Sequence, residues 1–143
     1  MEGDEKVRKK LFLLSAAVLC LFLLAGCKGK ALPDGMTEET VLSAGQEIVD
    51  LLVEGDCQGV YDRLRQDVQT TTTVEEIISY RDTVLDGVGE YKQVSNSMVT
   101  GITDEEQQQG IAVIYCKYDK KSIRFRVAFD PDMELIGFAM AKK

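Results

Sequence analysis

The spacing of apolar residues changes twice along this 143-residue chain. Residues 11–24 carry no charge, and Ser15 is their one clearly polar side chain. Further along, up to residue 85, apolar side chains recur every three or four residues, which is the period of an amphipathic helix. From Gly89 they alternate with polar residues, which is the period of a half-buried strand. The pattern predicts an apolar leader, then helices, then a sheet.

Three helices are predicted ahead of the sheet. Thr37 and Asp56 are suitable N-caps for the first two, and Thr73 with Glu76 forms a capping box for the third. Gly55 ends the first helix, because glycine adopts the left-handed conformation found after helix C-termini. The positions expected to face the core share the helical period: Val41, Ala44, Ile48, Val49, Leu52, Val60, Tyr61, Leu64, Val68, Val74, Ile77, Ile78, Val84 and Leu85, with the stem of Arg81.

Four strands are predicted after Gly89, over residues 90–102, 107–118, 122–129 and 135–141. The third has the clearest signal, with four apolar residues alternating strictly with polar or small ones. Short connections between successive strands favour antiparallel neighbours. The sequence therefore predicts an α+β fold in which three N-terminal helices pack on a curved four-stranded antiparallel meander.

The apolar leader has the features of an export signal. A cluster of Lys and Arg precedes it, and its fourteen residues would span only about 21 Å as a helix, short of a bilayer core of roughly 30 Å. Its end, Leu24-Ala25-Gly26-Cys27, resembles a bacterial lipobox. An uncleaved membrane anchor and an ordinary signal peptide are the alternatives. The cysteine directly after Leu-Ala-Gly favours a lipoprotein over both.

The resemblance to a lipobox implies a cellular location for the protein and a division of the chain into segments. Residues 1–26 are the expected signal peptide, residues 27–36 a lipidated cysteine with a flexible tether, and residues 37–143 one domain. Cys27 is the expected diacylglyceryl cysteine and carrier of palmitate-type acyl chains. The mature protein is then expected at the cell membrane, lipid-anchored and facing the extracytoplasmic side.

Two cysteines, Cys57 and Cys116, remain in the domain, since Cys20 leaves with the signal. In an oxidising compartment they could form a disulfide that closes a loop of about 60 residues. The alternative is two buried thiols acting as small apolar side chains. The spacing does not decide between them. The chain has no His and no CxxC pair, so we expect neither a metal site nor a cofactor.

The mature chain of 117 residues is acidic, with 13 Lys and Arg against 21 Asp and Glu from Lys28 onward, a net charge of −8. Nucleic acids and anionic membrane surfaces both require basic patches, so this balance disfavours them as partners.

Arg124 and Arg126 share one face of the third strand, and their planar guanidinium groups suit carboxylate or phosphate recognition. They are the candidate ligand-contacting residues, with a solvated sheet face as the alternative.

Three segments carry a resemblance to a known family. Residues 51–56 (LLVEGD) resemble its helix end and Gly-Asp turn, residues 87–91 (GVGEY) its entry to the sheet, and residues 127–138 its closing hairpin. Over roughly residues 38–141 the chain is similar to the family called domain of unknown function 3887, within the nuclear transport factor 2-like superfamily. The resemblance implies a cone-like fold and carries no established activity.

Two classes of function remain open. The first is a small membrane-tethered binding domain whose partner is a cell-envelope protein, a small ligand or a second copy of the chain. The alternative is a small cone-fold enzyme using carboxylate and Tyr acid–base chemistry, as enzymes of the superfamily do. No residue is assigned a catalytic role, but the candidates would be Tyr61, Asp62, Tyr80, Tyr91, Tyr115 and Asp130. A buried Asp beside two Tyr hydroxyls would favour the enzyme, and a filled interior would favour binding.

Overall fold

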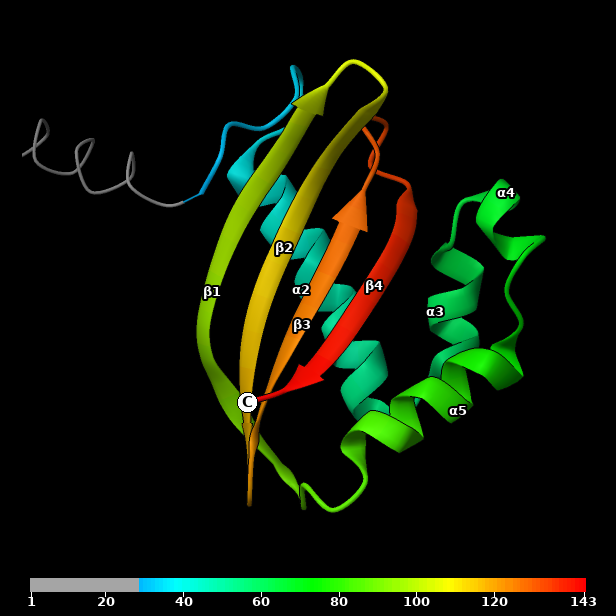
Figure 1. The fold of residues 1–143 in the computed structure, drawn as a ribbon, viewed down its shortest axis with the longest axis vertical. Helices are drawn as coiled ribbons and strands as arrows, with labels where there is room; N and C mark the ends of the chain where they lie inside the picture. The colour runs from blue at the N-terminus through cyan, green and yellow to red at the C-terminus, as the bar shows by residue number, and fades with distance from the viewer. Residues whose placement is uncertain (1–28) are drawn as a thin grey trace, which may run out of the picture.

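Residues 29–143 are described by the computed structural model, in which helices precede one open antiparallel sheet (Figure 1). The predicted signal peptide, its Leu24-Ala25-Gly26 end and Cys27 lie outside the described residues. Among residues 29–143, no helix combines the length and the apolar character needed to cross a membrane.

The helices begin where the sequence predicts. The Thr37 hydroxyl accepts a hydrogen bond from the Thr40 backbone N–H at 3.2 Å, the Asp56 carboxylate accepts one from Gly59, and Thr73 and Glu76 form their capping box. The described helices are α2 (Glu38–Glu54), α3 (Cys57–Arg63), α4 (Gln66–Gln69) and α5 (Val74–Leu85).

The second predicted helix is corrected, because it is divided in two. Leu64 is extended, with ψ of 141°, and pairs with Leu135 of the last strand in an isolated parallel bridge. The backbone N–H of Arg65 donates to the Leu135 carbonyl at 2.8 Å. This pairing between distant residues overrides the local helical period, so α3 ends before Leu64 and α4 makes a single turn.

The sheet is the predicted meander, in the order β1-β2-β3-β4 with antiparallel neighbours. Its strands are β1 (Tyr91–Asp104), β2 (Gln107–Tyr118), β3 (Ser122–Phe129) and β4 (Leu135–Lys142). The strands bow together, and β1 and β4 are the two edge strands (Figure 1). The α+β arrangement of helices followed by a four-stranded antiparallel sheet is therefore confirmed.

One face of the sheet packs against α2 and contributes the core. Ile114 and Phe125, paired across β2 and β3, have no exposed surface. The helix approaches closely because Gly45 faces Ala112. A Cβ built on Gly45 would lie 2.4 Å from the Cβ of Ala112. We call this side of the sheet the covered face.

The opposite side, which we call the uncovered face, has no described helix over it (Figure 1). Strand alternation and the pairing register place on it Asn96, Met98, Thr100, Ile102, Asp104, Gln107, Gln109, Ile111, Val113, Tyr115, Lys117, Ser122, Arg124, Arg126, Ala128, Gly137, Ala139 and Ala141, followed by Lys143. Ile111 and Val113 at its centre are only 5% and 4% exposed. Since no helix of residues 29–143 lies over them, the neighbouring side chains of this face cover them.

The described part of the segment ahead of α2, within the predicted tether, contacts the sheet and the core. Gly101 of β1 donates a backbone hydrogen bond to the Lys30 carbonyl at 3.1 Å. Leu32 packs against the core, and Met36 is only 7% exposed. Residues 30–36 therefore pack against the remainder of the described domain.

Candidate functional site

The uncovered face brings the two candidate arginines together with two further cations. Arg124 lies opposite Tyr115 in the β2–β3 register, and Arg126 lies opposite Val113. Lys117 follows two residues after Tyr115 on the same face. Lys143, just past β4, places its Nζ 5.1 Å from the centre of the Tyr115 ring, a cation–π contact. Four cations thus share one side of the sheet.

A shallow hollow lies at the end of the uncovered face nearest the C-terminus. It has a volume of about 470 Å³ and is lined by Ser95, Asn96, Tyr115, Ser122 and Lys143. Tyr115 presents an aromatic surface there, and the Lys143 ammonium caps its ring. The remaining lining groups are hydroxyls and an amide, which can donate hydrogen bonds. Such a lining fits a small anionic group, and Arg124 lies beside it in the register.

The charges of the uncovered face are not neutralised by their neighbours. Among the described residues, none of its four cations forms an ion pair. The Nε of Arg124 is buried and has no hydrogen-bond partner there. Alternation places one carboxylate on this face, Asp104, at the far end of the β1–β2 hairpin. It lies about 20 Å along the strands from the level of Arg126.

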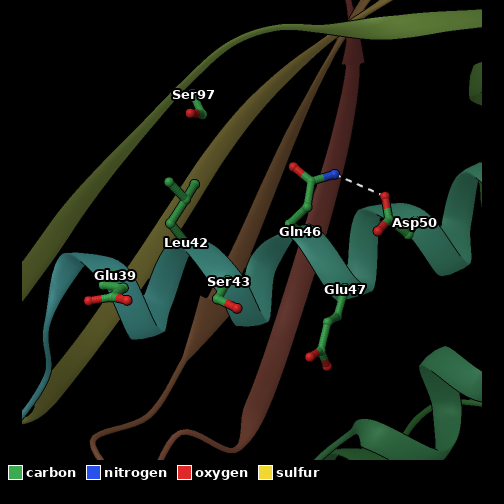
Figure 2. Close-up of a pocket in the computed structure, with 7 residues that line it drawn as sticks. All are labelled: Glu39, Leu42, Ser43, Gln46, Glu47, Asp50 and Ser97. Carbon is green, nitrogen blue, oxygen red and sulfur yellow. Dashed lines mark hydrogen bonds between the residues drawn. The ribbon is translucent and has the colours of Figure 1, made fainter.

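The helical side of the molecule has the opposite character. A groove of about 500 Å³ runs between α2 and β1, and the carboxylates of Glu39, Glu47 and Asp50 contribute to its lining. In Figure 2, Leu42 extends toward the side of Ser97, whereas Glu47 points away from β1. Asp50 accepts a hydrogen bond from Gln46, and Glu47 pairs with Arg63 on α3 at 2.8 Å. The carboxylates of this groove thus lie on the opposite side of the sheet from the uncovered face.

The candidate tyrosines are engaged in local structure. The Tyr61 hydroxyl donates to the Gln69 carbonyl at 3.4 Å, and the Tyr80 hydroxyl donates to the Met140 carbonyl at 3.1 Å. Tyr91 packs edge-on against Tyr118, with ring centres 5.7 Å apart. Burial raises the pKa of Tyr118 to about 12, so its hydroxyl stays protonated at neutral pH.

The candidate carboxylates lie apart from those hydroxyls. Asp62 accepts a hydrogen bond from Gln58 on the exposed side of α3. Asp130 is 8% exposed and accepts from the backbone N–H groups of Asp132 and Glu134 and from the Arg65 guanidinium. It therefore stabilises its own turn. The structure does not bring a buried Asp beside two Tyr hydroxyls within the described residues.

Cys57 and Cys116 are free thiols, both buried. Burial raises the pKa of Cys57, and it raises that of Cys116 to about 11. Each therefore remains a neutral thiol at physiological pH and fills space in the core. Among residues 29–143, no group of three or more His, Cys, Asp or Glu side chains is arranged to hold a metal ion.

Sequence reasoning missed two structural arginines and part of the uncovered face. Arg81 was expected to bury only its stem, yet its guanidinium donates to the carbonyls of Leu52 and Val53 and caps the end of α2. Arg65 joins the α3–α4 link to Asp130. Lys117 shows the same alternation as Tyr115, but only the pairing register places either beside Arg124.

Comparison with known proteins shows where this chain belongs. The profile of a family described as proteins of unknown function, DUF3887, matches residues 45–138, well over half of the chain. The chain belongs to the DUF3887 family. This match confirms the family resemblance in the sequence and includes α2 from Gly45 and most of the sheet.

The DUF3887 fold also resembles a solved structure. An NMR structure of a protein from Ruminococcus gnavus ATCC 29149 is 29% identical, with a TM-score of 0.66. The alignment covers 78% of this chain and 96% of that one. No curated protein matches the chain. The family and its fold are thus shown, while an activity has to be argued from the residues themselves.

Proposed function

We propose that this DUF3887 protein is an exported lipoprotein, cut before Cys27 and held at the cell membrane by acyl chains on that cysteine. Its domain then acts as an extracytoplasmic binding module. The support for the anchor is the short apolar segment that ends in Leu24-Ala25-Gly26-Cys27. In this proposal the uncovered face holds an anionic partner through carboxylate or phosphate groups.

The observation that carries the binding role is the charge of the uncovered face, which no ion pair within residues 29–143 neutralises. An acidic domain would most simply neutralise its cations with its many carboxylates, as it does at Arg63 and Arg65. Arg124 and Arg126 have no such partner among the described residues. Guanidinium groups form strong, directional hydrogen bonds with planar anions. The carboxylate or phosphate oxygens of an anionic partner would accept hydrogen bonds from Arg124 and Arg126.

We further infer that the fold belongs to the nuclear transport factor 2-like superfamily, which the helices-then-meander order supports. Apolar side chains such as Ile48, Leu52 and Phe125 fill the space between α2 and the sheet. A filled interior favours binding on the outside of the sheet over acid–base chemistry inside a cone. Binding is therefore the function that the geometry supports best.

The anchor is tested by the intact mass of detergent-extracted protein. We expect loss of residues 1–26 and added mass corresponding to acyl chains on Cys27. Cys27→Ala is expected to yield an unacylated precursor of full length. A wild-type chain that keeps its first 26 residues without added mass would contradict the proposal.

The binding role is tested with two defined probes, polyglutamate and inorganic pyrophosphate. Acylated protein in zwitterionic micelles is titrated with each, and Arg124→Ala/Arg126→Ala is expected to weaken binding about tenfold, as loss of charge-assisted hydrogen bonds predicts. Arg63→Ala/Lys142→Ala is the matched control, since it removes two cations from the helical side. Equal weakening by both variants would remove the uncovered face as the binding surface.

A further inference from the structure

The N-terminal segment holds a specified position on the edge of β1. The Lys30 backbone N–H donates to the Thr100 hydroxyl at 3.1 Å, and the Lys30 carbonyl accepts from the Gly101 N–H. Glycine is required for this approach. A Cβ on Gly101 would lie 2.1 Å from the Ala31 carbonyl oxygen, and Gly29 has φ of +94°. The segment is therefore part of the fold.

This placement leaves almost no linker, if Cys27 is acylated as proposed above. Lys28 alone separates Cys27 from Gly29. Two residues extend over at most about 7 Å. The acyl chains would therefore leave the protein at the outer edge of β1, close to Thr100. A domain attached so closely has little freedom to stand away from the bilayer.

The uncovered face begins at the same edge. Thr100 is one of its residues, and β3 lies two strands further across the sheet, about 10 Å away. Along the strands, Arg126 lies at the level of Met98 and Arg124 at the level of Asn96, two and four residues from Thr100. When the face turns toward the bilayer, Arg124 and Arg126 come within electrostatic range of the headgroups.

The charge distribution favours that orientation over the reverse. Within residues 29–143 the cations of the uncovered face form no ion pair, whereas the α2 side carries Glu39, Glu47 and Asp50. Ile102, 36% exposed, and Met98 add apolar side chains to the strand nearest the anchor. The mature chain has a net charge of −8, but the cations named above lie together on the uncovered face. The net charge therefore does not exclude an anionic membrane as a partner of this face.

We propose that the anionic partner of the uncovered face is the phospholipid surface to which the protein is anchored. The acyl chains on Cys27 fix one edge of the face. Lys117, Arg124, Arg126 and Lys143 then contact lipid phosphates, and the helices point away from the membrane. This inference rests on the proposed lipidation and identifies the anionic partner as a membrane.

The test compares lysine reactivity on two kinds of vesicle. Full acylated protein is reconstituted in phosphatidylcholine alone or with added phosphatidylglycerol, and an amine-reactive reagent is read by mass spectrometry at single lysines. Lys142 is the internal control, because its Nζ points to the Asp86 carbonyl on the covered side. Phosphatidylglycerol is expected to protect Lys117 and Lys143 about fivefold relative to Lys142, the size expected for one cation at an anionic surface.

A charge-reversed pair sharpens the comparison. Arg126→Glu is expected to abolish the protection, and Arg63→Glu on the helical side is expected to preserve it. If Arg126→Glu does not fold, as judged by circular dichroism, the wild-type comparison of the two vesicles decides alone. Protection should also disappear at high salt, because the contact is made by exposed charges.

Equal reactivity on both vesicles would overturn the membrane inference. The polyglutamate titration of the same preparation then separates the two proposals. Retained polyglutamate binding would leave the binding role in place with an acidic polypeptide as partner. Absence of protection, together with absence of binding to polyglutamate and to pyrophosphate, would remove the binding role as well.

Discussion

The two faces of the sheet differ in what lies over them, although they are made by the same strands. On β3, Phe125 points to the covered face and has no exposed surface, whereas its neighbours Arg124 and Arg126 point to the uncovered face. On β2, Ile114 likewise points to the covered face and Tyr115 to the uncovered face. Stability is therefore expected to reside on one face and binding on the other. Substitutions one residue apart can test them separately.

The largest expected effect is at Phe129 on the covered face. Phe129→Ala should lower the free energy of unfolding by about 3–5 kcal/mol, because it opens a cavity in the core. Arg124→Ala, on the other face of the same strand, should cost well under 1 kcal/mol. Chemical denaturation of both variants measures the difference. Equal costs would contradict the assignment of the two faces.

A smaller loss is expected where α2 meets the sheet. Gly45→Ala gains about 1 kcal/mol in helix propensity but forces two Cβ atoms together, and overpacking of this kind costs about 1–3 kcal/mol. We expect net destabilisation in urea denaturation. Adding Ala112→Gly to the same chain should recover part of the loss. A stabilised Gly45→Ala single variant would show that α2 lies further from β2.

A modest pH effect is expected at the entry to the sheet. The backbone N–H of Glu90 and the ammonium of Lys92 hold the pKa of Asp119 below its ordinary value. The stabilisation by the Asp119 carboxylate is therefore complete above about pH 4, the ordinary pKa of an aspartate in the unfolded chain. It is lost as the pH falls through the lower pKa of Asp119 in the folded protein. Asp119→Asn should show a smaller drop in urea midpoint between pH 6 and 3. Glu106→Gln, at the hairpin tip, is the control and should behave as wild type.

The sequence predicts those parts of the fold that local chemistry decides. Thr37, Gly55 and Thr73 mark helix ends because each satisfies or redirects the backbone beside it. The alternation along β3 likewise predicts which side chains face the core, because a strand has a fixed period of two. These signals need no knowledge of the remainder of the chain.

The parts that escaped prediction depend on contacts between distant residues. Leu64 leaves the helical path because Leu135 pairs with it, and the Arg81 guanidinium caps a helix that ends 27 residues earlier in the chain. The grouping of cations on the uncovered face likewise depends on contacts between residues distant in the sequence. Lys117 and Arg124 become neighbours only through the β2–β3 register, which the sequence pattern leaves open.

If the uncovered face binds and the covered face stabilises, an anionic probe must act on one face alone. Backbone-amide NMR of the acylated protein in zwitterionic micelles, recorded as polyglutamate is added, measures this residue by residue. We expect shift changes centred on Tyr115, Arg124 and Arg126, with the amides of α2 unchanged. Shift changes centred on α2 and its groove, with the amide shifts of the uncovered face unchanged, would contradict this division of roles.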